Sequence, residues 1–120
     1  MKKLMVVQNR IINIDNILKI ELAKPGEGNH IIFFKNGKSF PAETPFAPPS
    51  DFVRIGNTLL NPDAITYILV TTNSIMIKTL DGASVDAANE SVSPEAIQRW
   101  NDAKKFLVSL PGRIGEEDGY

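Results

Sequence analysis

An internal repeat in the sequence limits the folds that this chain can adopt. Residues 4–24 align with residues 52–72, and once three residues of the first copy are skipped, residues 28–42 align with residues 73–87. Nine of the 36 aligned pairs are identical, and they fall at turn residues and at matched apolar positions. The identical pairs are Asn9/Asn57, Asn13/Asn61, Asp15/Asp63, Ile17/Ile65, Ile20/Ile68, Ile32/Ile77, Gly37/Gly82, Ser39/Ser84 and Ala42/Ala87. Self-similarity at a fixed spacing is typical of a repeated structural unit, so the sequence predicts a tandem duplication.

Both copies have the side-chain pattern of β-strands. In the first copy Leu18, Ile20 and Leu22 alternate with other residue types, and residues 66–70 alternate in the same way. A period of two residues places successive side chains on opposite faces of a strand. Each copy then contains a dipeptide that tolerates the positive φ angles of a tight hairpin turn. These dipeptides are Asn36-Gly37 and Asp81-Gly82.

The two copies end differently. The first runs into a proline-rich stretch, residues 43–51, which excludes a helix and favours an extended crossover. The second leads into residues 93–110, where Ser93-Pro94-Glu95 supplies an N-cap serine, a first-turn proline and a first-turn acid. Apolar residues then recur at steps of three and four, as in an amphipathic helix that Pro111-Gly112 ends. They are Ala96, Ile97, Trp100, Ala103, Leu107 and Leu110.

We therefore expect an α+β fold, mainly antiparallel β, in which one C-terminal helix packs on the sheet. A chain of 120 residues fits one domain. We place that domain at residues 1–112. It comprises repeat 1 (residues 4–42), the crossover (43–51), repeat 2 (52–87) and the helix (93–110), followed by a flexible acidic tail (113–120).

The composition excludes several classes of function. The chain has no cysteine, so it has neither a disulfide nor a thiolate ligand or nucleophile. Its net charge is −1, whereas domains dedicated to duplex DNA or to a membrane surface usually carry a basic excess. The apolar run at residues 4–7 is shorter than that of an export signal, and no stretch is long enough to span a membrane. We expect a cytoplasmic protein that does not contact a membrane.

No residue pattern indicates catalysis, a metal or a cofactor. His30 is the only histidine and has no serine, carboxylate or second histidine at a spacing that argues for a catalytic partner, so we interpret it as a strand residue.

The motifs Asn13-Ile14-Asp15 and Asn61-Pro62-Asp63 place two carboxylates at equivalent positions, but Asn and Asp also start turns by bonding to nearby backbone. A duplicated turn is expected in a duplicated fold. The glycines form no phosphate-binding loop, and we expect a protein that is not an enzyme.

One set of residues has the chemistry of a binding surface. If Leu18 and Ile20 face the core, Lys19 and its counterpart Tyr67 point the other way, and Phe33 and its counterpart Lys78 follow on the next strand. Basic and aromatic residues thus exchange places between the copies, and Arg54 extends the set. Sheets that offer aromatic rings to bases and cations to phosphates commonly hold single strands. Two other interpretations stay open, because outward lysines also protect strand edges and Phe33 can belong to a core beneath the helix.

The strand order, the duplication, the Asn-Gly and Asp-Gly hairpins and the Ser-Pro-Glu helix resemble a known fold. It is the fold of the single-stranded-DNA-binding transcriptional regulators, which include the positive-cofactor coactivator domain and the plant Whirly proteins. More narrowly, residues 4–110 resemble a small group of uncharacterised cyanobacterial proteins whose one chain is similar to two fused units of that fold. In the Whirly pattern each copy ends in a helix, whereas the first copy here ends in prolines.

The function expected from this reasoning is that of a non-enzymatic binding or regulatory module. The first hypothesis is binding of single-stranded nucleic acid through Lys19, Phe33, Tyr67, Lys78 and Arg54. The alternative is a protein–protein interaction adaptor or small structural factor that uses its strand edges, crossover and helix. A fused pair of units has less need to dimerise, yet its outer strand edges can still pair, so the sequence leaves the oligomeric state open.

Overall fold

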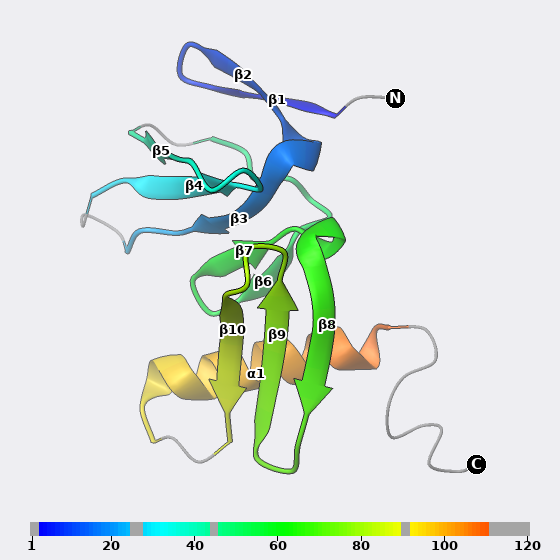
Figure 1. The fold of residues 1–120 in the computed structure, drawn as a ribbon. Helices are drawn as coiled ribbons and strands as arrows, with labels where there is room; N and C mark the ends of the chain where they lie inside the picture. Colours follow the sequence, from blue (N-terminus) through cyan, green and yellow to red (C-terminus); the bar gives the residue numbers. More distant parts are fainter. Residues whose placement is uncertain (1–2, 25–27, 44–45, 90–91, 111–120) are drawn as a thin grey trace.

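The two halves of the chain contain the same elements in the same order (Figure 1). The computed structural model describes residues 3–24, 28–43, 46–89 and 92–110. The first half consists of β1 (Leu4–Val7), β2 (Arg10–Asn13), the 3₁₀ turn η1 (Ile14–Asn16), β3 (Ile17–Glu21), β4 (His30–Phe34) and β5 (Ser39–Ala42). The second half consists of β6 (Val53–Ile55), β7 (Thr58–Leu60), η2 (Pro62–Ala64), β8 (Ile65–Val70), β9 (Ser74–Thr79) and β10 (Ser84–Ala88), followed by the helix α1 (Pro94–Val108). The predicted β-rich α+β fold with antiparallel strands and one C-terminal helix is confirmed; the acidic tail lies outside the described residues.

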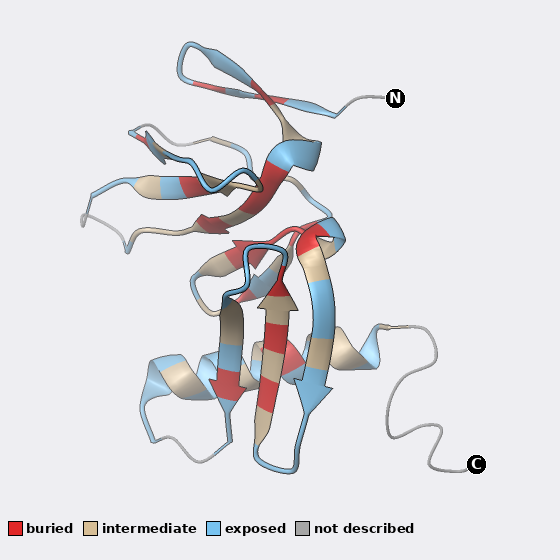
Figure 2. Cartoon of the chain, in the orientation of Figure 1, coloured by how far each residue is buried: buried red, intermediate tan, exposed pale blue. Residues whose placement is uncertain are grey.

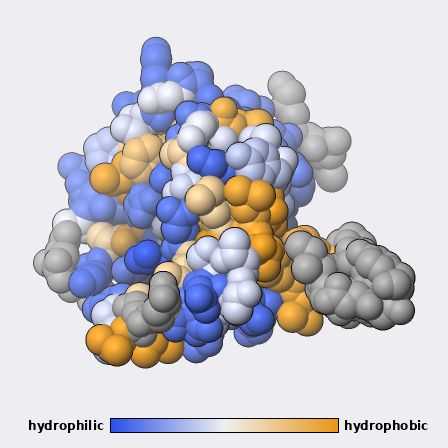
Figure 3. Space-filling view, turned by 60° about the horizontal axis from the view of Figure 1, so that its bottom comes forward, coloured by the Kyte–Doolittle hydropathy of each residue, from blue (hydrophilic) through white to orange (hydrophobic). Residues whose placement is uncertain are grey.

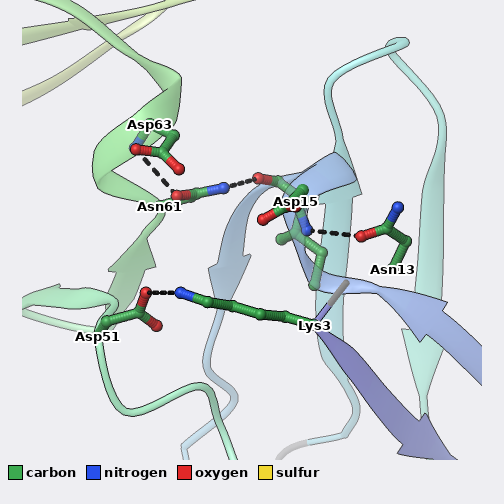
Figure 4. Close-up of polar contacts among 7 residues, drawn as sticks. Lys3, Asn13, Asp15, Asp51, Asn61 and Asp63 are labelled. Carbon is green, nitrogen blue, oxygen red and sulfur yellow. Dashed lines mark hydrogen bonds and ion pairs between the residues drawn. The ribbon is translucent and has the colours of Figure 1, made fainter. Parts of the chain in front are cut away.

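The repeated Asn-x-Asp motif forms the same turn in both halves (Figure 4). The Oδ1 atom of Asn13 accepts a hydrogen bond from the backbone N–H of Asp15, and that of Asn61 accepts one from the N–H of Asp63, each at 3.0 Å. The backbone angles of the two asparagines agree within a few degrees, at φ −76° and −73°. These side chains cap short 3₁₀ turns, which is the structural role that the sequence favours over a metal or acid–base pair.

The hairpins that open the two halves also turn in the same way. The first residue of each turn, Gln8 in one and Gly56 in the other, has a positive φ of 56° and 62° respectively. These two residues are aligned when the sequences of the two halves are compared. Glycine adopts this region without strain, while Gln8 is held there with its side chain bonded to the backbone N–H of Glu43 at 2.8 Å.

The two halves are joined because the second half completes the sheet of the first. The described strands form a five-stranded sheet in the order β5-β4-β3-β7-β6, a three-stranded sheet β10-β9-β8, and the hairpin β1-β2. Strand β7 lies antiparallel to β3, with Ile20 opposite Leu59. In the second half, β8 occupies the place of β3 but forms the edge of its sheet, and the β1-β2 hairpin pairs only with itself.

Two clusters of buried side chains form the core, one for each half (Figure 2). The first lies between the β1-β2 hairpin and the five-stranded sheet, and the second lies between α1, the β6-β7 hairpin and the three-stranded sheet. The first consists of Met5, Val7, Ile12, Ile17, Ile20, Ile32, Ala42, Phe52 and Leu59. The second consists of Ile55, Leu60, Ile75, Ile77, Ala87 and Ala103. Phe52 and Leu59 therefore belong to the second half in sequence and to the first half in packing.

The helix α1 crosses behind β10 and β9 in Figure 1 and also contacts β6. It begins at Ser93, whose Oγ atom accepts a hydrogen bond from the N–H of Ala96 at 3.1 Å, as the sequence predicts. Ala103 is buried at the centre of the contact, with Trp100 and Leu107 packed beside it. Ile97 was expected in this apolar stripe but is 46% exposed. It lies about 120° around the helix from Ala103, which places it outside the buried face.

Candidate binding surface

The predicted site residues form two cross-strand pairs at equivalent places in the two halves. Lys19 on β3 lies opposite Phe33 on β4, and its Nζ atom is 5.2 Å from the centre of the Phe33 ring. Tyr67 on β8 lies opposite Lys78 on β9. Each pair therefore joins a cation to an aromatic ring, with the two residue types exchanged between strands. Phe33 pairs with Lys19 and does not belong to the core beneath α1.

A β-bulge at the start of each strand fixes which way these side chains point. The pairing register shifts between Ile17 and Lys19 in β3, and between Ile65 and Tyr67 in β8. A bulge adds one residue to a strand and re-aims the side chains that follow it. After the shift, Ile20 is fully buried while Lys19 lies on the opposite face.

The Tyr67–Lys78 pair lies on the face of the three-stranded sheet that α1 does not cover. Along β9, Ile75 and Ile77 are buried in the core with α1, and Lys78 alternates with them. Tyr67 is 48% exposed. This sheet face carries an aromatic residue and a lysine at directly opposed positions, and the Tyr67 ring is exposed to a ligand.

Lys19 has a more enclosed position. Its side chain is 18% exposed and its Nζ atom lies 3.3 Å from Oε2 of Glu21. It lines a crevice of about 540 Å³ that includes Asp86 and Arg99, so acidic and basic groups meet there. Lys19 is therefore less available to a ligand than the Tyr67–Lys78 pair, since part of its charge is already compensated.

The hairpin turn that follows β9 carries a carboxylate with a perturbed acidity. A hydrogen bond from the Thr79 hydroxyl lowers the pKa of Asp81 below its usual range, and the positive charge of Lys19 also contributes. The Oδ1 atom of Asp81 accepts a second hydrogen bond from the N–H of Ala83 at 3.1 Å. Asp81 thus holds the turn closed, and its carboxylate lies within electrostatic reach of the crevice around Lys19.

Arg54 lies apart from the cross-strand pairs. It sits on β6, donates from Nε to the carbonyl oxygen of Gly56 at 3.0 Å, and lines a groove of about 830 Å³ between the β6-β7 hairpin and α1. Across this groove, Oδ2 of Asp102 accepts a hydrogen bond from the N–H of Gly56 at 2.9 Å, and Gln98 donates to its Oδ1 at 2.7 Å. The bond between Gly56 and Asp102 fastens the hairpin to the helix.

Sequence reasoning missed this groove because no local signal marks it. It forms where Gly56 meets Asp102, and these residues are 46 positions apart in the chain. An aspartate on the exposed side of a helix and a glycine in a turn each have an ordinary local explanation, and only tertiary packing brings them together.

His30 has structural contacts. Its Nδ1 atom accepts a hydrogen bond from the backbone N–H of Ala23 at 2.9 Å, and its ring packs edge-on against Phe46 at 5.7 Å. The ring thereby ties the end of β3 to the start of β4 and to the chain that follows β5. Within the described ranges, no group of three or more histidine, aspartate or glutamate side chains is placed to hold a metal ion.

No protein-family model, curated protein or solved structure matches this chain. In the part of the chain that the structure describes, no helix combines the length and the apolar character needed to cross a bilayer.

Proposed function

We propose that this chain is a non-enzymatic module that binds single-stranded nucleic acid on the open face of the β8-β9-β10 sheet. The observation that carries the proposal is the repeated cross-strand pair of a cation and an aromatic ring. Of the two pairs, Tyr67–Lys78 is the main contact, because it lies on the face opposite α1. Lys19 and Phe33 form the second contact on the neighbouring sheet, and Arg54 has a peripheral role.

The chemistry of this pair fits a single strand. A tyrosine ring stacks on a nucleobase of any type, and a neighbouring ammonium group attracts the phosphate that follows. Because the chain carries no overall basic excess, attraction comes from these local cations and falls steeply as salt is added. The tandem duplication and the resemblance to single-stranded-DNA-binding regulators, both part of this proposal, agree with such a role.

The test is a fluorescence-anisotropy titration of a labelled oligothymidylate at low and at near-physiological salt. A stacked base contributes about 1–3 kcal/mol, so Tyr67→Ala should raise Kd about five-fold or more. Lys78→Glu should weaken binding further and flatten its dependence on salt, because one phosphate contact is lost. The matched control is Lys104→Glu, which makes the same charge change at an exposed residue of α1 that does not line the groove of Arg54.

Two results would count against this function. Absence of binding at low salt, where electrostatic attraction is strongest, would remove nucleic acid as the ligand. Equal weakening by Lys78→Glu and Lys104→Glu would show that binding follows net charge alone, and the assigned face would be wrong.

A second candidate function, protein binding, is favoured by a different observation. Leu69 and Val70 on β8 are 50% and 36% exposed, and apolar side chains on a strand edge suit a protein partner better than a polyanion. A pull-down in which a specific protein is retained, together with no binding of oligonucleotides, would support this candidate.

A further inference from the structure

Two surfaces of this chain are open although their counterparts in the same chain are paired. Among the described strands, the β8 edge has no neighbour, whereas β3, at the equivalent position, is paired with β7. The β1-β2 hairpin pairs only with itself, whereas the equivalent β6-β7 hairpin joins the sheet of the other half. The contact between β3 and β7 therefore shows how an open hairpin and an open strand edge of this kind fit together.

The internal contact is held by backbone bonds and by two side-chain bonds, one of them from the Thr58 hydroxyl to Oε1 of Glu21 at 3.3 Å. The N–H of Leu22 donates to the carbonyl oxygen of Asn57 at 2.7 Å, and the N–H of Asn61 donates to that of Leu18 at 3.1 Å. The side-chain Nδ2 of Asn61 donates to the carbonyl oxygen of Ile17 at 2.8 Å. The backbone bonds and the Asn61 bond have counterparts at the open surfaces, whereas Thr58 and Glu21 correspond to Arg10 and Leu69, which cannot form the same bond.

Side chains of the hairpin cross into the neighbouring core at two positions. Phe52 and Leu59 are 9% and 7% exposed because they pack in the core of the first half. Their counterparts in the first hairpin, Leu4 and Ile11, are 58% and 71% exposed. The exposed pair thus has the positions and the apolar character of side chains that enter a neighbouring core.

Of the remaining apolar residues of the first hairpin, Val6 is also exposed, at 66%, and its counterpart Arg54 is exposed as well. Val7 and Ile12 are buried in their own half, as are their counterparts Ile55 and Leu60. Apart from Val6, the exposed apolar side chains of the first hairpin are therefore the two that would cross to another unit.

The β8 edge offers free backbone N–H groups to which a hairpin like β1-β2 can bond. Thr71 bonds to Ser74 across the β8–β9 ladder, and bonding alternates along antiparallel strands, so the N–H groups of Ile68 and Val70 point away from β9. No residue from 65 to 70 is charged or proline, although exposed edges usually carry such protection. Figure 3 shows hydrophobic side chains gathered on the flank where Figure 1 draws β8.

We propose that copies of this chain associate head to tail, with β2 of one copy adding to β8 of the next as β7 adds to β3. If β2 and β8 pair in the register of β7 and β3, Ile12 lies opposite Tyr67, Ile11 opposite Ile68, and Arg10 opposite Leu69 of the neighbouring copy. Asn13, whose Nδ2 corresponds to the bonded Nδ2 of Asn61, then donates to the carbonyl oxygen of Ile65.

A second copy is the occupant because both complementary surfaces belong to one chain. A foreign strand could add to β8, but it would not explain why Leu4 and Ile11 are exposed at the positions of Phe52 and Leu59. Head-to-tail contacts of this type are heterologous, so they close into a ring or extend as a filament according to the rotation between copies.

The experiment is size-exclusion chromatography with multi-angle light scattering at micromolar concentration. The wild-type chain should show at least twice the 13.2 kDa mass of one copy. Ile11→Lys places a charge where the neighbouring core should close, and Val70→Pro removes an outward N–H from an edge strand, where proline is tolerated. Each variant alone should be monomeric while keeping the circular dichroism spectrum of the wild type; if Val70→Pro does not fold, Val70→Asp replaces it.

Two comparisons make the test specific. Val6→Lys is the matched control, because Val6 is exposed on the same hairpin and its counterpart Arg54 stays exposed in the internal contact. This variant should associate like the wild type. An equimolar mixture of Ile11→Lys and Val70→Pro should regain a species of two chains, since one variant keeps an intact β8 edge and the other an intact hairpin.

A monomeric wild type would overturn the proposal. So would an oligomer that persists in Ile11→Lys, because that result would mean pairing of two β8 edges or another surface altogether. Failure of the mixture to regain a two-chain species would overturn the head-to-tail arrangement in particular.

Discussion

Asn13 and Asn61 show how one residue type acquires a second role when a neighbouring strand is present. Both cap a 3₁₀ turn through Oδ1, but only Asn61 is buried, at 4% exposed, and also donates through Nδ2 to Ile17. Capping depends on local sequence, and the sequence predicts it in both halves. The additional bond depends on the contact between β3 and β7, which local sequence does not reveal.

Replacing each asparagine by alanine should separate these two roles. Asn13→Ala removes a cap and should lower the free energy of unfolding of the monomer by about 1 kcal/mol. Asn61→Ala removes the cap and also leaves the carbonyl oxygen of Ile17 without this donor, so it should cost about 2 kcal/mol. Urea denaturation in the monomeric Val70→Pro background measures both values; equal losses would contradict the assignment.

The Asp81 turn gives a prediction about pH. Because the hydrogen bond from Thr79 lowers the pKa of Asp81 in the folded state, the unfolded chain takes up the proton first. The stabilisation is therefore fully present above the unfolded pKa of about 4 and is lost as the pH falls through the lower, folded value. The difference in Tm between the wild type and Asp81→Asn should shrink between pH 7 and pH 3, and a constant difference in thermal scans would contradict this.

At the scale of elements, the sequence predicted the strands and turns but not the way the strands pair. Alternating apolar residues, Asn-Gly and Asp-Gly turns and the Ser93 cap are local features, and the structure has strands, turns and a helix where they indicate them. The pairing of β3 with β7 joins residues about 40 positions apart, and the same apolar pattern would satisfy several partners. The Lys19–Phe33 and Tyr67–Lys78 pairs could be predicted, because each pair lies on the two strands of one hairpin. The groove at Arg54 could not, because it joins residues that are distant in the sequence.

The two hairpins offer a matched test of that pairing. Leu59→Ala leaves a cavity in the first core and should lower the free energy of unfolding by about 3 kcal/mol. Ile11→Ala changes an exposed side chain at the equivalent position and should cost less than about 0.5 kcal/mol in the monomeric Val70→Pro background. Similar losses in urea denaturation would mean that the two hairpins are packed alike within one chain.

At the scale of the whole molecule, the chain has a head and a tail. One end presents a hairpin with exposed Leu4 and Ile11, and the other presents an unprotected strand edge at β8. In the proposed assembly, β2 pairs with β8 of the next chain in the way that β7 pairs with β3 within one chain. On this account the open face with Tyr67 and Lys78 would be repeated along the assembly, which would give a long single strand several equivalent contacts.

Disulfide cross-linking can detect the head-to-tail pairing of β2 with β8, because the natural chain contains no cysteine that would interfere. Arg10→Cys and Leu69→Cys are both exposed positions, and the proposed register places them directly opposite each other in neighbouring copies. Glu21→Cys with Thr58→Cys is the positive control, since these residues face each other within one chain. Opposed residues that form a non-hydrogen-bonded pair in an antiparallel ladder have Cα atoms about 4.5 Å apart, which is within reach of a disulfide.

Mass spectrometry of the oxidised mixture gives the answer. We expect a mixed disulfide between peptides containing residue 10 and residue 69, and much less when Leu69→Cys is replaced by Thr72→Cys, three residues out of register. Absence of the residue 10–69 disulfide, or an equal yield with Thr72→Cys, would contradict head-to-tail pairing of β2 with β8.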